Sequence, residues 1–225
     1  MRRHIVLAAV FCQVVLAAPS KDTQKRLEEA GLVLEEIMGT ADNAIPQGLL
    51  NKAECAVVIP GLKKGAFIFG GQYGRGFLTC RKKAGAGWSA PGAVRMEGAS
   101  FGLQIGGSET DVVMLVMNRR GAERLLASKF TVGGDASVAA GPVGRTAKAE
   151  TDATMRAEIL AWSRSRGVFA GISLQGATLR QDGGVNNEMY GDKFEENRAI
   201  VESGLAAPKA AAKLLKLLNK YSSRK

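Results

Sequence analysis

The stretch Trp88–Met117, WSAPGAVRMEGASFGLQIGGSETDVVMLVM, decides the fold. It begins at an aromatic and proline corner, continues as two short apolar runs bent at glycines, and ends in a continuous apolar strand, Asp111–Met117. Four glycines stand where ordinary strands carry β-branched residues: Gly98, Gly102, Gly106 and Gly107. Glycine at such positions lets neighbouring backbones approach closely. We therefore expect a strongly curved antiparallel sheet, or a barrel-like one, at the core.

Two weaker copies of this pattern flank the central stretch, GAFIFGGQYGRGFLTC at 65–80 and GVFAGISLQGATL at 167–179. Before them, apolar residues recur at helical spacing within Ser20–Met38, which predicts an N-terminal helix. With 225 residues, of which 46% are hydrophobic, the chain can bury one sizeable core. The predicted class is α+β, with a single domain over residues 19–204 and flanking N- and C-terminal helices.

The first 18 residues, 1–18, have the pattern of a signal peptide. Arg2 and Arg3 form a positive start, and Ile5–Leu16 is apolar but too short to span a bilayer. Small residues follow, with cleavage expected after Ala17 or Ala18. An uncleaved N-terminal anchor is the alternative. The pattern predicts an extracytoplasmic protein, periplasmic or secreted, associated peripherally with a membrane.

Removal of that segment takes away the only histidine, His4. A chain without histidine has no Ser/His/Asp triad, no Cys/His pair and no His-ligated metal. We therefore expect no enzyme activity, no metal and no cofactor, and we interpret Ser100, in a G-x-S-x-G match, as structural. Cys55 and Cys80 remain in the mature chain and predict either a disulfide or two buried thiols.

The formal net charge of +10 points to an anionic partner or to simple solubility. The last 21 residues, 205–225, predict a basic amphipathic helix, because no acid occurs from Pro208 onward and leucines hold the face opposite the lysines. Its lysines repeat at i, i+4, i+7 and i+11: Lys209, Lys213, Lys216 and Lys220. Contact with an acidic phospholipid surface and docking on the domain explain the leucine face equally well.

A second basic patch is predicted around the first hairpin, from Lys63, Lys64, Arg81, Lys82 and Lys83. Together with the C-terminal lysines it forms the candidate lipid-binding surface. Nucleic acid is a poor partner, because export separates the chain from it and few aromatic residues interleave the basic ones.

An ordered set of short motifs runs from about Ile45 to about Val201. Its members are Ile45-Pro46, Val58-Ile59-Pro60, Gly70-Gly71 with Gly74-Arg75-Gly76, Trp88-Ser89-Ala90-Pro91, Gly102 with Gln104 and Gly106, Asp111, Gly141-Pro142 with Gly144-Arg145, and Ser163-Arg164-Ser165-Arg166-Gly167 with Phe169 and Gly171. This ordered set resembles the SYLF domain. The resemblance implies binding of phosphoinositides or other acidic lipids. Eukaryotic relatives carry SH3 or FYVE modules, and yeast members also bind actin filaments.

Three features depart from the family pattern. Trp162 stands where the family usually has a tyrosine, and no SH3 or FYVE module is present. The N-terminal helix, basic in relatives, is rich in acids here: Glu28, Glu29, Glu35 and Glu36. The basic surface is therefore expected at the C-terminal helix instead.

From the sequence we favour an exported, non-enzymatic domain that binds acidic phospholipid or phosphoinositide headgroups at a membrane surface. The alternative is an envelope scaffold or protein-binding module, actin-binding in relatives, without lipid specificity.

Overall fold

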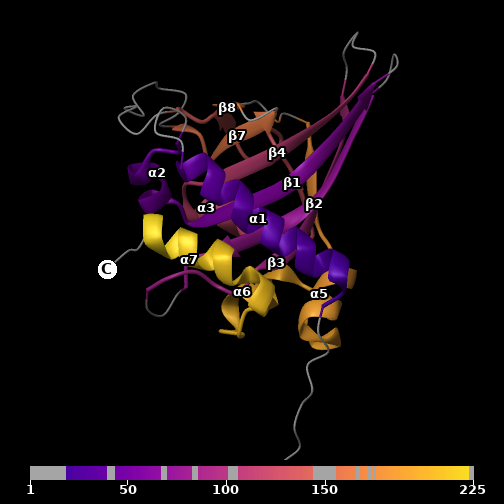
Figure 1. Ribbon diagram of the computed structural model, residues 1–225, viewed down its shortest axis with the longest axis vertical. Helices are drawn as coiled ribbons and strands as arrows, with labels where there is room; N and C mark the ends of the chain where they lie inside the picture. The colour runs from indigo at the N-terminus through magenta and orange to yellow at the C-terminus, as the bar shows by residue number, and fades with distance from the viewer. Residues whose placement is uncertain are drawn as a thin grey trace, which may run out of the picture.

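The computed structural model describes residues 19–222 except 40–43, 67–69, 83–85, 101–105, 144–155, 166–167, 172–173 and 175. The predicted signal peptide, residues 1–18, lies outside the described residues. Within them, strands form one strongly curved sheet, and helices from both ends of the chain cover one of its faces (Figure 1). The α+β class predicted from the sequence is confirmed.

The sheet has the strand order β5-β9-β3-β2-β1-β4-β7-β6, and β8 also pairs with β7. The strands are β1 (Cys55–Ala66), β2 (Gly70–Cys80), β3 (Gly92–Ser100), β4 (Gly106–Val116), β5 (Lys129–Thr131), β6 (Val138–Ala140), β7 (Ile159–Ser165), β8 (Val168–Gly171) and β9 (Thr178–Gln181). All pairs are antiparallel, as expected, except β6 with β7, which is parallel.

The two ends of this order meet, which makes the sheet barrel-like. β5 and β6 stand at opposite ends of the strand order but follow each other in the chain. A bridge between Val132 and Ala136 joins the residues that directly follow β5 to those that precede β6. The chain can link the two end strands over so few residues only if the sheet rolls up.

The central strands are buried on both faces. Along β1, Cys55, Val57 and Ile59 pack into the interior of the rolled sheet, whereas Ala56 and Val58 pack into a second core under the helices. β4 alternates in the same way. A strand with two buried faces has a nearly continuous apolar sequence instead of an alternating one, which explains the uninterrupted run VVMLV in β4.

The helices are α1 (Lys21–Gly39), α2 (Gln47–Lys52), α3 (Arg119–Leu125), α5 (Gly183–Tyr190), α6 (Asn197–Glu202) and α7 (Ala212–Tyr221), with short 3-10 turns η1 (Asp192–Phe194) and η2 (Lys209–Ala211). Asn118 caps α3, and its side-chain oxygen accepts a hydrogen bond from the Gly121 N–H at 2.8 Å. No helix in the described part of the chain is long and apolar enough to cross a membrane.

The first and last helices pack side by side across the sheet (Figure 1). The apolar stripe of α7, Leu214, Leu217 and Leu218, is buried in the same core as Leu27 and Leu34 of α1. Contact is close at Gly31, where a Cβ atom would lie 3.1 Å from the Leu214 nitrogen. The leucine face of the C-terminal helix therefore docks on the domain.

Two glycine-rich segments predict turns from their residue types, and both predictions are wrong. The residues 61–65 are typical of a turn followed by a return strand, but β1 continues through them to Ala66. The residues Gly71–Gly76 are typical of a bend between strands, but they lie within β2. Gly74 and Gly76 of β2 are needed because β1 and β2 lie very close here. A Cβ atom on Gly76 would lie 2.1 Å from the Val58 carbonyl oxygen and 2.7 Å from the Ile59 Cα.

We predict that Gly76→Ala lowers the free energy of unfolding by about 2–3 kcal/mol, because the new methyl group meets backbone atoms that cannot move aside. Gly65→Ala is the matched control, since a Cβ atom on that β1 glycine meets nothing within 4 Å. It should change stability by less than about 0.5 kcal/mol. Urea unfolding of both variants checks this, and equal stability would show that β1 and β2 are not in such close contact.

Candidate functional site

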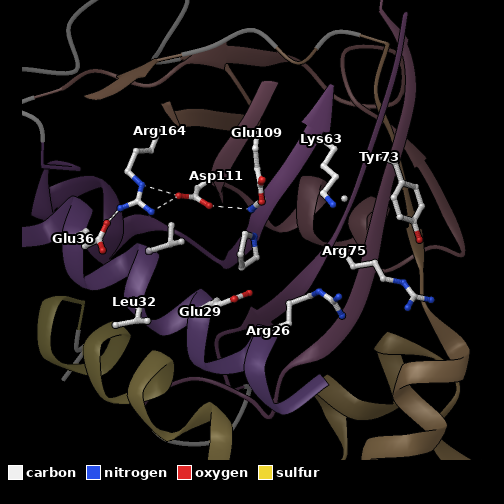
Figure 2. Close-up of a pocket in the computed structure, with 14 residues that line it drawn as sticks. Arg26, Glu29, Leu32, Glu36, Lys63, Tyr73, Arg75, Glu109, Asp111 and Arg164 are labelled. Atoms are coloured by element: carbon white, nitrogen blue, oxygen red, sulfur yellow. Dashed lines mark hydrogen bonds and ion pairs between the residues drawn. The ribbon is translucent and has the colours of Figure 1, made fainter. Parts of the chain in front are cut away.

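A cavity of about 470 Å³ lies between α1 and the outer face of β1, β2 and β4 (Figure 2). Its size is in the range of small-ligand or side-chain binding sites. Charged residues dominate its lining, together with an exposed leucine and an exposed tyrosine. The lining residues include Arg26, Glu29, Leu32, Glu36, Pro60, Gly61, Lys63, Tyr73, Gly74, Arg75, Glu109, Asp111 and Arg164.

Strand register places the charged side chains together. Lys63 of β1 lies directly opposite Tyr73 of β2 and also directly opposite Glu109 of β4. Arg75 lies two residues after Tyr73 on β2, and Asp111 lies two residues after Glu109 on β4. Side chains two residues apart on a strand project from the same face. The site is therefore built from one face of three adjacent strands, with α1 above it.

An ion-paired chain links this face to α1. Asp111 of β4 lies opposite Arg164 of β7, and its Oδ2 accepts hydrogen bonds from Arg164 Nε at 2.7 Å and from the other guanidinium nitrogen, Nη2, at 2.5 Å. The remaining Arg164 nitrogen pairs with Glu36 of α1. These contacts are drawn in Figure 2. They fix the position of the helix over the sheet.

Asp111 also holds a β-bulge in β1. Its second oxygen, Oδ1, accepts a hydrogen bond from the Gly61 N–H at 2.9 Å. The register of β1 with β4 shifts between Ile59 and Leu62, and Gly61 has a φ of +60°, which favours glycine. Burial raises the pKa of the Asp111 carboxyl; the Gly61 hydrogen bond opposes this, and the negative charges of Glu109 and Glu29 add to it.

Some groups at the cavity have no partner in the described part of the chain. The side chains of Arg26, Lys63, Tyr73 and Glu109 make no hydrogen bond or ion pair there. Arg75, by contrast, pairs with the buried Asp182 at 2.9 Å. The unpaired groups are the ones free to bind a ligand.

Two apolar side chains stand at the same cavity. Tyr73 is 48% exposed and Leu32 is 43% exposed. Among the described residues, Val143 is the third large hydrophobic side chain with this degree of exposure. A pair of exposed apolar groups beside charged ones is typical of a protein-binding surface.

Residues from several of the motifs that resemble the SYLF domain line this cavity. Pro60, Gly74, Arg75, Asp111 and Arg164 come from four motifs spread along the chain and meet here. The sequence identified these residues as a set, but not the cavity that they share. The missed signal was the two-residue spacing of Tyr73 with Arg75 and of Glu109 with Asp111, which puts each pair on one strand face.

Not all of the predicted C-terminal lysines are free to contact a lipid surface. Lys213 pairs with Glu35 of α1 at 2.6 Å, so it helps to dock α7. Lys220 lies over the ring of Tyr221, 5.0 Å from its centre. Lys209, Lys216 and Lys220 are exposed on the face of η2 and α7 that turns away from the core.

The structure does not bring the second basic patch together. Lys63 and Lys64 lie toward the far end of β1, whereas Arg81 and Lys82 follow β2 at the other end of the hairpin, roughly 25 Å away at strand spacing. Lys83 lies outside the described residues. Arg81 is a structural residue, because its guanidinium donates to the carbonyls of Leu50 and Ala53 at the end of α2 and stacks on Trp88 at 4.1 Å.

Cys55 and Cys80 lie opposite each other on β1 and β2 and are joined by a disulfide, with their Cα atoms 4.0 Å apart. Among the described residues no group of three or more His, Cys, Asp and Glu residues is placed to hold a metal ion. Ser100 is the last residue of β3, and the residues that directly follow it lie outside the described part of the chain.

Comparison with known proteins gives a consistent result. Residues 97–221 match the profile of the Ysc84 family, described as Las17-binding protein actin regulator. The chain is 37% identical over 182 residues to Protein YSC84 of Saccharomyces cerevisiae, covering 79% of this chain and 38% of the relative. It is 36% identical over 182 residues to LAS seventeen-binding protein 3 of the same yeast, covering 79% and 39%.

Vertebrate proteins match as well. SH3 domain-containing YSC84-like protein 1 of Xenopus laevis is 31% identical over 185 residues, covering 81% of this chain and 54% of the relative. The chain thus spans about half, or less, of the length of these relatives. Their names and the family description indicate protein binding and actin regulation and do not describe an enzyme.

These comparisons correct the predicted location. The extracytoplasmic prediction was wrong, because the relatives are yeast and vertebrate proteins described as Las17-binding, actin-regulating or SH3-containing. That prediction was based on the composition of one short segment, whereas the similarity extends over four-fifths of the chain.

We predict that Asp111→Ala lowers the free energy of unfolding by about 2 kcal/mol, because it leaves Arg164 without its main partner and removes the acceptor that holds the bulge. The value is below the 3–5 kcal/mol typical of a fully buried pair, since both side chains are partly exposed. Glu109→Ala, which removes a neighbouring acid without a partner, is the control and should be nearly neutral. Urea unfolding measures both, and an Asp111→Ala variant as stable as the control would contradict the proposed link.

Proposed function

The chain belongs to the Ysc84 family, the SYLF-domain proteins described as Las17-binding actin regulators, and on that premise we propose that it is a non-enzymatic module that binds a protein partner. The partner surface is the cavity between α1 and the sheet, together with its apolar rim. The partner that we propose is the actin filament, because the family is described as an actin regulator and the resemblance to the SYLF domain implies actin binding in yeast members.

One observation carries this proposal: the family motifs converge on the cavity at which Leu32 and Tyr73 are exposed. Leaving a large apolar side chain in water forgoes about 1.5–3 kcal/mol of burial free energy. Tyrosine is also among the residues that dominate binding energy at interfaces. The ion pairs from Asp111 through Arg164 to Glu36 hold this rim in place, so little conformational entropy is lost on binding.

Tyr73→Ala combined with Leu32→Ala should weaken co-sedimentation of the full chain with actin filaments at least tenfold, because both apolar anchors are removed. Val143→Ala is the control, since it removes an exposed apolar side chain that does not line the cavity. Equal pelleting of the double variant and the control would exclude this rim as the actin-binding surface, and no pelleting of the wild-type chain would exclude actin as the partner.

Acidic-lipid binding is a second candidate function, favoured by the exposed lysines of η2 and α7. Lys209, Lys216 and Lys220 are exposed, while Leu214, Leu217 and Leu218 of the same segment are buried. Each lysine near an anionic membrane contributes about 1 kcal/mol, so three contribute about 3 kcal/mol in total. Because the leucines are already buried in the domain, binding would be electrostatic and peripheral.

The triple change of Lys209, Lys216 and Lys220 to Gln should reduce flotation with vesicles that contain phosphatidylserine at least tenfold at low salt. Lys193→Gln, a single exposed lysine on η1, provides a control for non-specific charge effects. Binding that is unchanged in the triple variant, or equal on neutral vesicles, would rule out this surface as a lipid site.

A further inference from the structure

We propose that the cavity binds an acidic segment of the protein partner, with a carboxylate held between Arg26 and Lys63 beside the Tyr73 ring. The inference rests on the proposed function and adds the chemistry of the partner to it. Arg26 comes from α1 and Lys63 from β1, so the two cations approach the cavity from the helix side and from the sheet side (Figure 2).

The cations without a partner favour an anion at their part of the cavity. The cavity is lined by as many acids as bases, and three of the four acids already have a cationic partner: Asp111 and Glu36 share the single charge of Arg164, and Glu29 lies 3.7 Å from Lys25. Among the described lining residues, two cations have no partner, Arg26 and Lys63, against one such acid, Glu109.

Of the two free cations, Lys63 is exposed but Arg26 differs from an ordinary surface charge. Arg26 lines the cavity and is half-buried, so the effective dielectric constant around it is lower than in water and a charge pair is correspondingly stronger. An arginine also presents a planar set of donors that matches a carboxylate in two hydrogen bonds. Tyr73, directly opposite Lys63, adds a hydroxyl donor and an apolar ring.

The shape and surroundings of the site favour a protein segment over a membrane. A bilayer would have to lie across α1, whose exposed Glu28 repels an anionic surface. A narrow peptide enters between helix and sheet without covering that acid, which does not line the cavity. The exposed Leu32 and Tyr73 then contact an apolar residue next to the acidic one.

The test is fluorescence anisotropy with three labelled decapeptides added to the full chain: one of Glu and Leu, one of Gln and Leu, and one of Lys and Leu. The Glu/Leu peptide should bind at least tenfold more tightly than the Gln/Leu peptide, and its affinity should fall with added salt. The double variant Arg26→Glu, Lys63→Glu should lose this binding and gain affinity for the Lys/Leu peptide.

The double variant Lys129→Glu, Lys193→Glu is the matched control, because it makes the same change in net charge at exposed lysines of β5 and η1 that do not line the cavity, and it should leave peptide binding unchanged. Thermal unfolding of both variants checks that they fold. The charge-swapped Lys/Leu peptide provides an independent readout, since only a folded cavity with reversed charge gains affinity for it.

Three results would overturn the inference: equal binding of the Glu/Leu and Gln/Leu peptides, wild-type affinity in the cavity variant, or cavity-dependent binding of phosphatidylserine vesicles without peptide binding.

The actin assay separates this inference from the proposed function. If actin binding is lost in the Tyr73 and Leu32 variant but kept in the charge-reversed one, the protein-binding function stands and the acidic-segment inference fails. If the wild-type chain binds the acidic peptide but no actin, only the actin assignment fails.

Discussion

The structure depends on β1 being buried on both faces. One face packs into the interior of the rolled sheet and the other packs under α1 and α7, so a single strand connects two hydrophobic cores. Such a strand tolerates little change in side-chain size on either face. The glycines of β2 let that neighbouring strand approach β1 closely. The bulge at Pro60–Gly61 is where this packing is interrupted, and the charged cavity lies there.

The parts of the fold that could be predicted are those encoded locally. The helix over Ser20–Met38, the strand after Asp111 and the cap at Asn118 each follow from a short pattern of residues, and the structure contains all three. The extent of β1 could not be predicted in this way. Gly61 and Gly65 are typical turn residues, and only pairing with β4, about 45 residues later, keeps them in a strand.

The candidate site could not be predicted from the sequence for a related reason. Its ion pairs join α1, β4 and β7, and its free cations come from α1 and β1, so no single stretch of sequence contains it. Counting charges along the chain also overestimated the basic surface. Arg81 closes the end of α2, Arg75 pairs with a buried aspartate and Lys213 joins α7 to α1, so these cations stabilise the fold.

The short strands at the ends of the sheet have a consequence for self-association. β5 and β6 have three residues each, and the turn between them brings the two ends of the sheet together. A long unpaired strand offers main-chain donors and acceptors on which another chain can add and begin an aggregate. Here the longest strands, β1, β2 and β4, have partners on both sides. A chain so rich in β-structure and glycine is thereby protected against stacking into amyloid-like fibres.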